Sequence, residues 1–489
     1  MKHTAHGYWL EEAGEVAPLP ALQGDLSVDV VVIGGGYTGL WTAWHLKKLE
    51  PEASVALLEA GVCGHGPSGR NGGFCNSMWF SLPNMRRRWG DEAGLAVARA
   101  SREAVDGVEA FCREEGVDAW FRRGGYLQVS TAPAHDGVWD EAVVACRELE
   151  NGNRGSGGDA SPVRVLDPSE VAERCASPAF RGGAFYVDAA TVQPARLAQG
   201  LRARLLVAGV AIHEHSPVRR LSASCSFVPP GGGTSHQHRA GSGVVAETDG
   251  GTVRAGAAVV AIGGAAKAPR APLRNALTVT SSHIVLTEPV PELLEEIGWT
   301  GGECITDSRA LIDYFRTTPD GRIAFGWGGG RISMGARLRG RSELDREAVD
   351  AAAERLRAYF PGLAGRRVTH AWGGPIDVAP THTPIVVPLS GSRSFAAAGY
   401  TGNGVGPSHR VARTLASLAL DRRDDHSRLP FVDPDPQHVP PEPLHWLGGE
   451  LIRRALTHKE NAELSDHRPH PISSVLSKLP ELVGFHIGR

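Results

Sequence analysis

Apolar and polar positions change their spacing twice within the first sixty residues. Residues 29–33 form an apolar, β-branched run with the length of a buried parallel strand. Residues 37–50 then place apolar side chains at helical spacing, and Pro51 ends that helix. A second short apolar run, 54–58, stops at Glu59. The order strand, helix, strand predicts a β-α-β unit.

The same two patterns predict elements further along the chain. Residues 278–335 alternate strand-like runs with turn signals such as Pro319-Asp-Gly321, which indicates an antiparallel sheet in a second domain. The other expected elements are helices at 91–115, 193–208, 411–420 and 446–456, and strands at 210–213, 257–262 and 395–399.

Composition narrows this picture mainly by exclusion. With 489 residues, 42% hydrophobic and 21% charged, the chain is too long for one ordinary domain and can build a large core. A formal charge of −3 gives no reason to expect nucleic acid or an anionic membrane as a partner. The seven cysteines are scattered and form no C-x-x-C, so neither a disulfide framework nor a metal site is expected. No secretory signal and no run of about 18 apolar residues is visible, so a cytoplasmic protein is expected by default.

The segment Gly34-Gly-Gly36-Tyr37-Thr38-Gly39 follows the first strand and opens the first helix. It has the spacing G-x-G-x-x-G of a dinucleotide-binding turn. Gly34 permits the tight turn, Gly36 lets the backbone approach a pyrophosphate, and Gly39 allows close packing of helix on strand. The free N–H groups at the start of the helix, including those of Tyr37 and Thr38, favour an anion.

Glu59 ends the second strand about where a ribose-binding acid belongs. Its carboxylate can accept hydrogen bonds from the ribose 2′- and 3′-hydroxyls, and it would repel a 2′-phosphate. Glu59 and the adjoining Ala60 therefore predict a dinucleotide other than NADP. The alternative is a Gly-rich turn in an α/β fold that binds no nucleotide.

A string of small and polar residues follows shortly after Glu59. An NAD-specific domain has no need of this string, whereas a flavin extends past the second strand and needs a flat loop beside it. Ser68 and Arg70 offer donors to phosphate oxygens; a surface loop with a solvated arginine is the alternative. The residues of the string expected to contact the cofactor are Ser68, Gly69, Arg70, Asn71, Gly72 and Gly73.

Two later turns at strand ends complete the predicted cofactor site. The first follows the strand 257–262 and is where flavoproteins close over the nucleotide; the second precedes a helix whose N-terminus could stabilise negative charge on a reduced flavin. Ordinary Gly-rich turns are the alternative for both. The residues expected to contact the cofactor here are Val218, Ala261, Gly263, Gly402, Asn403, Gly404 and Val405.

Taken together, these motifs resemble the glycine oxidase / D-amino-acid oxidase superfamily of flavoproteins. The resemblance covers most of residues 8–420, and its most specific parts are the Gly34–Gly39 turn paired with the 68–73 string, and the late 399–405 turn. Tyr8-Trp-Leu10 and the 68–73 string look most like the branch that contains gamma-glutamylputrescine oxidase.

The resemblance implies bound FAD and oxidation of a C–N bond in a small-molecule amine or amino acid. In family terms a hydride passes to flavin N5, the imine hydrolyses to a carbonyl compound, and O2 reoxidises the flavin to give hydrogen peroxide. Monomeric sarcosine oxidases of this superfamily carry a lysine that aids oxygen reduction, but residues 304–331 contain none. That branch also attaches its flavin through a late cysteine. No cysteine follows Cys304, so noncovalent FAD is expected unless His65 or another early residue forms a link.

Substrate-contacting residues are harder to identify, and no catalytic side chain is assigned because the flavin performs the chemistry. Tyr314 could form a pocket wall and Arg316 could clamp a carboxylate through two hydrogen bonds. An aromatic core residue and a hairpin arginine are the respective alternatives. Phe74 and Tyr400 adjoin the predicted flavin loops and are better placed to touch substrate.

The expected fold class is α/β, with a discontinuous Rossmann-like FAD-binding domain and a substrate domain built on an antiparallel sheet. The expected ranges are a lead-in at 1–28, the FAD-binding domain at 29–80, 193–265 and 395–420, the substrate domain with its connecting helices at 81–192 and 266–394, and a C-terminal extension at 421–489.

Three alternatives to an amine or amino-acid oxidase remain open on sequence grounds. A flavin dehydrogenase would pass its electrons to a carrier instead of O2. A nucleotide-binding module would have no catalysis of its own. An NAD-dependent dehydrogenase is disfavoured by the 68–73 string.

Overall fold

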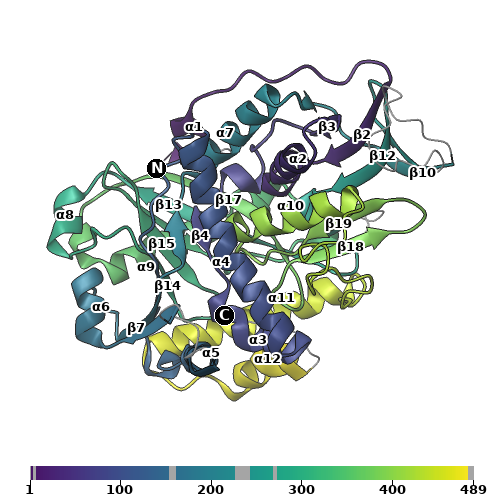
Figure 1. Cartoon of the computed structure of the whole chain (residues 1–489). Coiled ribbons are helices and arrows are strands. Elements are labelled where there is room, and N and C mark those ends of the chain that lie inside the picture. The colour runs from purple at the N-terminus through teal and green to yellow at the C-terminus, as the bar shows by residue number, and fades with distance from the viewer. Residues whose placement is uncertain (1, 4–6, 153–160, 226–242, 268–272, 483–489) are drawn as a thin grey trace.

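The computed structural model describes residues 2, 3, 7–152, 161–225, 243–267 and 273–482. These residues form two large sheets with helices packed around them (Figure 1). Residues 1, 4–6, 153–160, 226–242, 268–272 and 483–489, which belong to several of the predicted ranges, lie outside the described residues. None of the helices in the described part of the chain combines the length and apolarity that a bilayer crossing requires.

The smaller sheet has eight strands with a parallel centre, as expected for the first domain. Its order is β10-β11-β12-β2-β3-β9. Strand β11 pairs with the first half of β12, and β19 pairs with the last residues of β12. The pairs β12–β2, β2–β3, β3–β9 and β12–β19 are parallel. The strands are β2 (Leu26–Ile33), β3 (Val55–Leu58), β9 (Ala211–His213), β10 (Arg220–Ser224), β11 (Gly243–Glu247), β12 (Thr252–Val260), β18 (Ile385–Leu389) and β19 (Ser394–Ala398).

The larger sheet has nine strands in the order β1-β17-β13-β16-β15-β14-β5-β7-β6. Its centre is antiparallel, as the 278–335 pattern predicts, but β14–β5 and β1–β17 are parallel, so the sheet is mixed. The strands are β1 (Lys2–His3), β5 (Tyr126–Ser130), β6 (Val163–Leu166), β7 (Gly182–Tyr186), β13 (Thr278–Thr287), β14 (Cys304–Asp307), β15 (Asp313–Thr317), β16 (Ile323–Trp327) and β17 (Val368–Val378). A separate pair is formed by β4 (Phe74–Asn76) and β8 (Ala189–Thr191).

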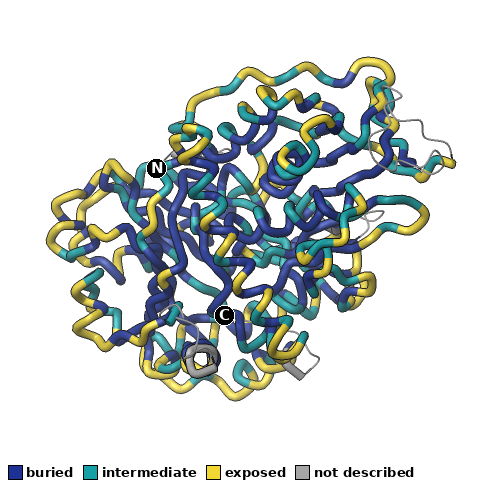
Figure 2. Tube along the Cα trace, in the orientation of Figure 1, coloured by how far each residue is buried: buried dark blue, intermediate teal, exposed yellow. Residues whose placement is uncertain are grey.

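Helices cover the smaller sheet and bridge the two sheets. Helix α2 packs against α10, and both α10 and the long α4 border the same core (Figure 1). Figure 2 shows the strands of both sheets buried and the exposed positions on the outer helices and loops. The helices are α1 (Gly7–Ala13), α2 (Tyr37–Leu49), α3 (Leu82–Trp89), α4 (Asp91–Glu114), α5 (Asp140–Gly152), α6 (Pro168–Arg174), α7 (Pro194–Val207), α8 (Pro291–Glu296), α9 (Arg346–Tyr359), α10 (Val405–Ala419), α11 (Leu444–Leu464) and α12 (Pro471–Leu482).

The structure differs from the predicted elements and ranges in several places. Strand β18 pairs with β19 in the smaller sheet, although its residues fall in the range expected for the substrate domain. Helix α10 begins at Val405, six residues before the predicted 411, because the preceding Gly-rich turn leads into it directly. The helices without a counterpart among the predicted elements include α3, α5, α6, α8, α9 and α12.

Residues near the start of the chain pack into the core, whereas the sequence predicts only a lead-in at 1–28. Trp9 in α1 is fully buried, and its ring meets Trp372 of β17 edge to face with 5.9 Å between centroids. The side chain of Gln193 donates a hydrogen bond to the Trp9 carbonyl oxygen at 2.7 Å. Helix α1 therefore packs against both α7 and strand β17 of the larger sheet.

Helix α11 is fastened to the larger sheet by two buried carboxylates. Glu450 accepts a hydrogen bond from the Ile332 backbone N–H at 2.7 Å. Glu460, 4% exposed, accepts from the N–H groups of Ala310 at 2.7 Å and Leu311 at 3.1 Å. Both contacts serve loop backbone that no strand pairs, so α11 completes the hydrogen bonding of these loops.

We expect Glu460→Ala to lower the free energy of unfolding by about 2–4 kcal/mol, because two buried N–H groups lose their acceptor. Denaturant unfolding followed by circular dichroism measures the change. Glu173→Ala, at an exposed position of α6, is the matched control and should stay within about 0.5 kcal/mol of the parent. Equal midpoints for the Glu460 variant and the parent would contradict the anchoring role.

Candidate cofactor and substrate site

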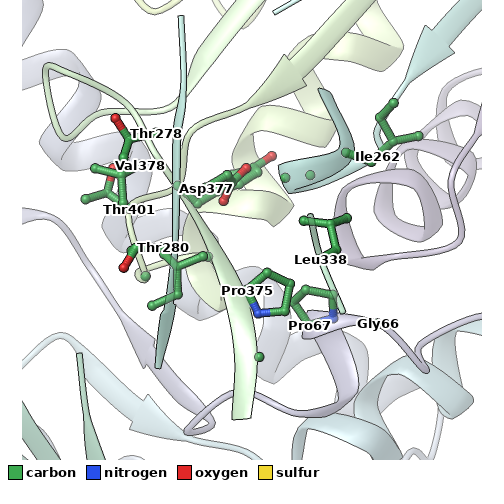
Figure 3. Close-up of a pocket in the computed structure, with 18 of the residues that line it drawn as sticks. Gly66, Pro67, Ile262, Thr278, Thr280, Leu338, Pro375, Asp377, Val378 and Thr401 are labelled. Atoms are coloured by element: carbon green, nitrogen blue, oxygen red, sulfur yellow. The ribbon is translucent and has the colours of Figure 1, made fainter. Parts of the chain in front are cut away.

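A cavity of about 1610 Å³ is lined by residues of both sheets and of α11. Sites for ordinary small ligands enclose about 300–1,000 Å³. The larger volume therefore leaves room for an extended dinucleotide together with a second, smaller molecule. Figure 3 shows strand β17 crossing the cavity, with Thr278 and Thr280 on one side of Asp377 and Ile262 and Leu338 on the other.

The turn after β2 is shaped by two glycines that no other residue could replace. Gly34 has a φ of +109°, and a Cβ there would lie 2.3 Å from the Ala261 carbonyl oxygen. A Cβ on Gly39 would lie 1.9 Å from the Gly34 carbonyl oxygen. Because both positions lack a side chain, α2 starts directly against the end of β2 and β12, and its N-terminus opens on the cavity.

The N-terminus of α2 presents backbone donors to the cavity. Gly36 is the N-cap residue, and as a glycine it has no side chain that could accept a hydrogen bond from the first turn. A Cβ on Gly36 would lie 3.0 Å from Ser68 Oγ, which itself accepts a hydrogen bond from the Tyr37 N–H at 2.9 Å. A helix N-terminus with uncapped N–H groups attracts an anion such as a pyrophosphate.

The Glu59 carboxylate lies beside this turn at the end of β3. One oxygen accepts a hydrogen bond from the Gly35 N–H at 2.6 Å, and the other accepts from the Gly61 N–H at 2.7 Å. These two bonds fix the orientation of the carboxylate in the cavity wall. Each oxygen keeps a second acceptor position, which is what binding a ribose diol requires.

The 66–73 loop is held in shape by Asn71. Its amide donates to the Ser68 carbonyl at 2.8 Å and accepts from the Gly73 N–H at 2.7 Å. Arg70 is buried, which lowers its pKa, and its backbone carbonyl accepts a hydrogen bond from the Trp372 ring at 2.8 Å. Asn71 thus braces the loop, while Ser68 and Arg70 line the cavity.

The late turn closes the cavity from the opposite side. Gly399, Thr401 and Gly402 all have positive φ, at +85°, +52° and +78°. Asp377 of β17 holds the turn: its carboxylate accepts from the Gly399 N–H at 2.8 Å and its carbonyl accepts from the Thr401 N–H at 2.9 Å. Helix α10 then begins at Val405 with its N-terminus toward the cavity.

Two tyrosines border the space next to these loops. The Tyr314 hydroxyl lies 2.6 Å from Ser282 Oγ, and its ring meets Phe74 edge to face at 5.8 Å. The Tyr400 hydroxyl lies 2.7 Å from Thr38 Oγ1, and burial raises the pKa of that hydroxyl. Both hydroxyls can orient a bound molecule by hydrogen bonding.

The predicted role of Arg316 as a carboxylate clamp is wrong for this structure. Its guanidinium lies outside the cavity and donates to the carbonyl oxygens of Val192 and Gly73. It also lies over the Trp9 ring, 5.5 Å from the centroid. Burial lowers its pKa to about 10. These partners hold the guanidinium against the backbone of Gly73 and Val192, outside the cavity.

The structure brings most of the predicted site residues to one cavity. The predicted residues that line it are Gly34, Gly36, Tyr37, Thr38, Glu59, Ala60, Ser68, Arg70, Asn71, Gly72, Phe74, Val218, Ala261, Gly263, Tyr314, Tyr400, Gly402, Gly404 and Val405. The predicted residues that do not line it are Gly39, Gly69, Gly73, Arg316 and Asn403.

Two sets of lining residues are absent from the sequence-based assignment. Thr278, Thr280 and Ser282 of β13 point into the cavity, and their spacing of two along a strand is a signal that the sequence contains. Asp377 of β17 and several residues of α11 also line it. No local pattern marks these, because they reach the cavity only through tertiary packing.

The family model described as "DAO: FAD dependent oxidoreductase" matches residues 29–418. A probable oxidoreductase OrdL of Rhizobium meliloti is 27% identical over 436 residues, covering 85% of this chain and 89% of that protein. Gamma-glutamylputrescine oxidoreductase of Escherichia coli is 26% identical over 462 residues, covering 93% and 96%. Glycine oxidase from Geobacillus kaustophilus has a similar fold, with a TM-score of 0.62, 20% identity and coverage of 83% and 98%.

We expect Gly36→Ala to weaken uptake of FAD by at least about tenfold, because a methyl group would occupy the position where backbone approaches the pyrophosphate. Fluorescence titration of the flavin-stripped protein with FAD measures the dissociation constant. Gly448→Ala, at a lining position where a Cβ meets nothing within 4 Å, is the control and should bind FAD as the parent does. Unchanged affinity in the Gly36 variant would contradict this assignment of the turn.

Burial raises the pKa of Asp377 to about 6. The unfolded chain ionises this group near pH 4, so the folded protein loses stability as the pH rises from about 4 to about 6. Asp377→Asn removes that loss and keeps an acceptor for Gly399. The melting temperature of the variant relative to the parent should therefore be higher at pH 7 than at pH 4. Exposed Asp425→Asn should show no such trend, and a pH-independent difference for Asp377→Asn would contradict the assignment.

Proposed function

The chain belongs to the DAO family of FAD dependent oxidoreductases, and we propose that it oxidises a C–N bond of a small amine or amino acid. The observation that carries this proposal is the single cavity that joins a dinucleotide cradle to a space bordered by Tyr314 and Tyr400. A molecule bound beside these tyrosines would lie against the reactive end of a cofactor held by the cradle. Family membership makes a non-catalytic nucleotide-binding module the weaker alternative.

The residues present fit FAD. The missing side chains at Gly34 and Gly36, the N-terminus of α2 and the oriented Glu59 carboxylate would hold the ADP half. The Ser68–Gly72 loop and the N-terminus of α10 would hold the remainder. When bound, FAD supplies the two-electron acceptor for oxidation of the substrate. We propose 29–80, 193–265 and 385–420 as the cofactor-binding part and 81–192 and 266–384 as the substrate part, since β18 pairs in the smaller sheet.

The side chains around the second space serve to orient the substrate. Tyr314 bridges the 66–73 loop and β13: a Cβ on Gly72 would lie 2.8 Å from its ring, and its hydroxyl contacts Ser282. Movement of that ring would therefore disturb both neighbours. No side-chain base is needed if the amine binds in its neutral form, and we assign none.

We propose that the flavin is held without a covalent bond and that O2 is the electron acceptor. None of the described residues that line the cavity is a cysteine, which supports the first point. None of them is a lysine either. The lysine that aids oxygen reduction in monomeric sarcosine oxidases therefore has no equivalent among these residues. That observation keeps a dehydrogenase with another acceptor as the second candidate.

The proposed function predicts that an amine or amino acid bleaches the 450 nm absorbance region of the FAD-loaded protein without air. A panel of primary and secondary amines and amino acids, mixed anaerobically in a stopped-flow instrument, tests this. Bleaching by no member of the panel would contradict the proposal. Admitting air to the reduced protein then separates the two acceptors. Return of the yellow colour within seconds, with one peroxide per flavin, supports the oxidase, whereas slow return favours the dehydrogenase.

A further inference from the structure

Apolar side chains from loops of the larger sheet and from α11 line part of the cavity, which we call the chamber. We define the chamber by Leu311, Ile312, Ile332, Ile452 and Leu456, all of which line the cavity. Two of these belong to α11, which lies beyond residues 29–418 that match the family model. The chamber is thus walled partly by the sheet loops of the family fold and partly by the C-terminal helix.

The contacts of α11 fix the position of this wall. Glu450 and Glu460 accept hydrogen bonds from the backbone of Ile332 and Leu311, which are themselves chamber residues. Gly449 packs so closely that a Cβ there would lie 2.5 Å from Ile332 Cδ1. The helix and the loops therefore form one packed unit around the chamber.

Charged groups near the chamber are already paired. Arg453 of α11 lines the cavity, but its guanidinium binds both oxygens of Glu450 at 3.0–3.1 Å and the Gly329 carbonyl at 3.3 Å. Among the lining residues that the structure describes, the carboxylates are Glu59, in the dinucleotide cradle, and Asp377, which holds the late turn. Neither belongs to the chamber.

A charged substituent would therefore lose its hydration in the chamber without gaining a partner. Burying an unpaired ammonium or carboxylate is strongly unfavourable, whereas burying methylene groups contributes roughly 0.8 kcal/mol each. Polar groups that line the same cavity include the hydroxyls of Thr280, Ser282 and Tyr314, which can bind a neutral amine nitrogen. The hydroxyl groups could therefore bind the reacting C–N bond, while the apolar chamber residues surround the rest of the molecule.

Resting on the proposed function, we infer that the substrate is an amine with an uncharged, apolar substituent that occupies the chamber, and that Ile452 is a specificity-determining residue. Diamines and amino acids, whose second charged group would enter the chamber, are disfavoured.

The test compares two molecules of equal size, n-pentylamine and 1,4-diaminobutane, together with their N-methyl derivatives. Binding to the FAD-loaded protein is measured by perturbation of the flavin spectrum, and turnover by anaerobic bleaching. We expect the pentylamines to bind at least about tenfold more tightly than the matched diamines. Equal or tighter binding of the diamines would overturn the inference. Tighter binding of the pentylamines, with no bleaching by them or by any amine or amino acid of the panel, would support the chamber assignment while contradicting the proposed function.

Ile452→Asp supplies the carboxylate that the chamber lacks, and Ile452→Asn is its uncharged control. We expect Ile452→Asp to raise the affinity for the diamines relative to the pentylamines by at least about tenfold, and Ile452→Asn to leave that ratio within about threefold of the parent. Flavin content and the melting temperature check that both variants are folded. The same diamine preference in Ile452→Asp and Ile452→Asn would overturn the role of Ile452.

Discussion

The contact between Gly34 and Gly39 is the constraint on which the cofactor end of the molecule depends. A side chain at Gly39 would collide with the Gly34 carbonyl, and one at Gly34 would collide with the Ala261 carbonyl. Because neither residue has a side chain, the ends of β2 and β12 and the start of α2 can pack directly against one another. Three features follow from that packing: the helix N-terminus opens on the cavity, Ser68 reaches the Tyr37 N–H, and the Ala261 turn lies beside the same space.

Strand β17 connects this end to the larger sheet. Its Trp372 donates to the Arg70 carbonyl in the cofactor loop and packs against Trp9. Five residues later, Asp377 holds the late turn through Gly399 and Thr401. One strand thus positions two loops that line the cavity relative to the hydroxyl-bearing face of β13.

The sequence predicts the local parts of this arrangement and misses the non-local ones. The β-α-β unit and its glycine turn could be predicted because strand, turn and helix are encoded within about thirty residues. Arg316 was misassigned since its true partners, the Gly73 and Val192 carbonyls and the Trp9 ring, come from three distant segments. The sequence predicts a helix at 446–456, but the order of apolar and polar residues in it does not indicate that it packs against the loops at 310–312 and 332.

The position of α11 in the chain also has a consequence for biosynthesis. The strands of both sheets and the glycine turn leave the ribosome before α11 does, since the last strand, β19, ends at Ala398 and α11 begins at Leu444. While α11 is still inside the exit tunnel, the N–H groups of Ala310 and Leu311 lack their acceptor and the apolar wall at Ile332 faces solvent. A nascent chain with both sheets assembled therefore exposes an apolar surface until α11 emerges and packs over it.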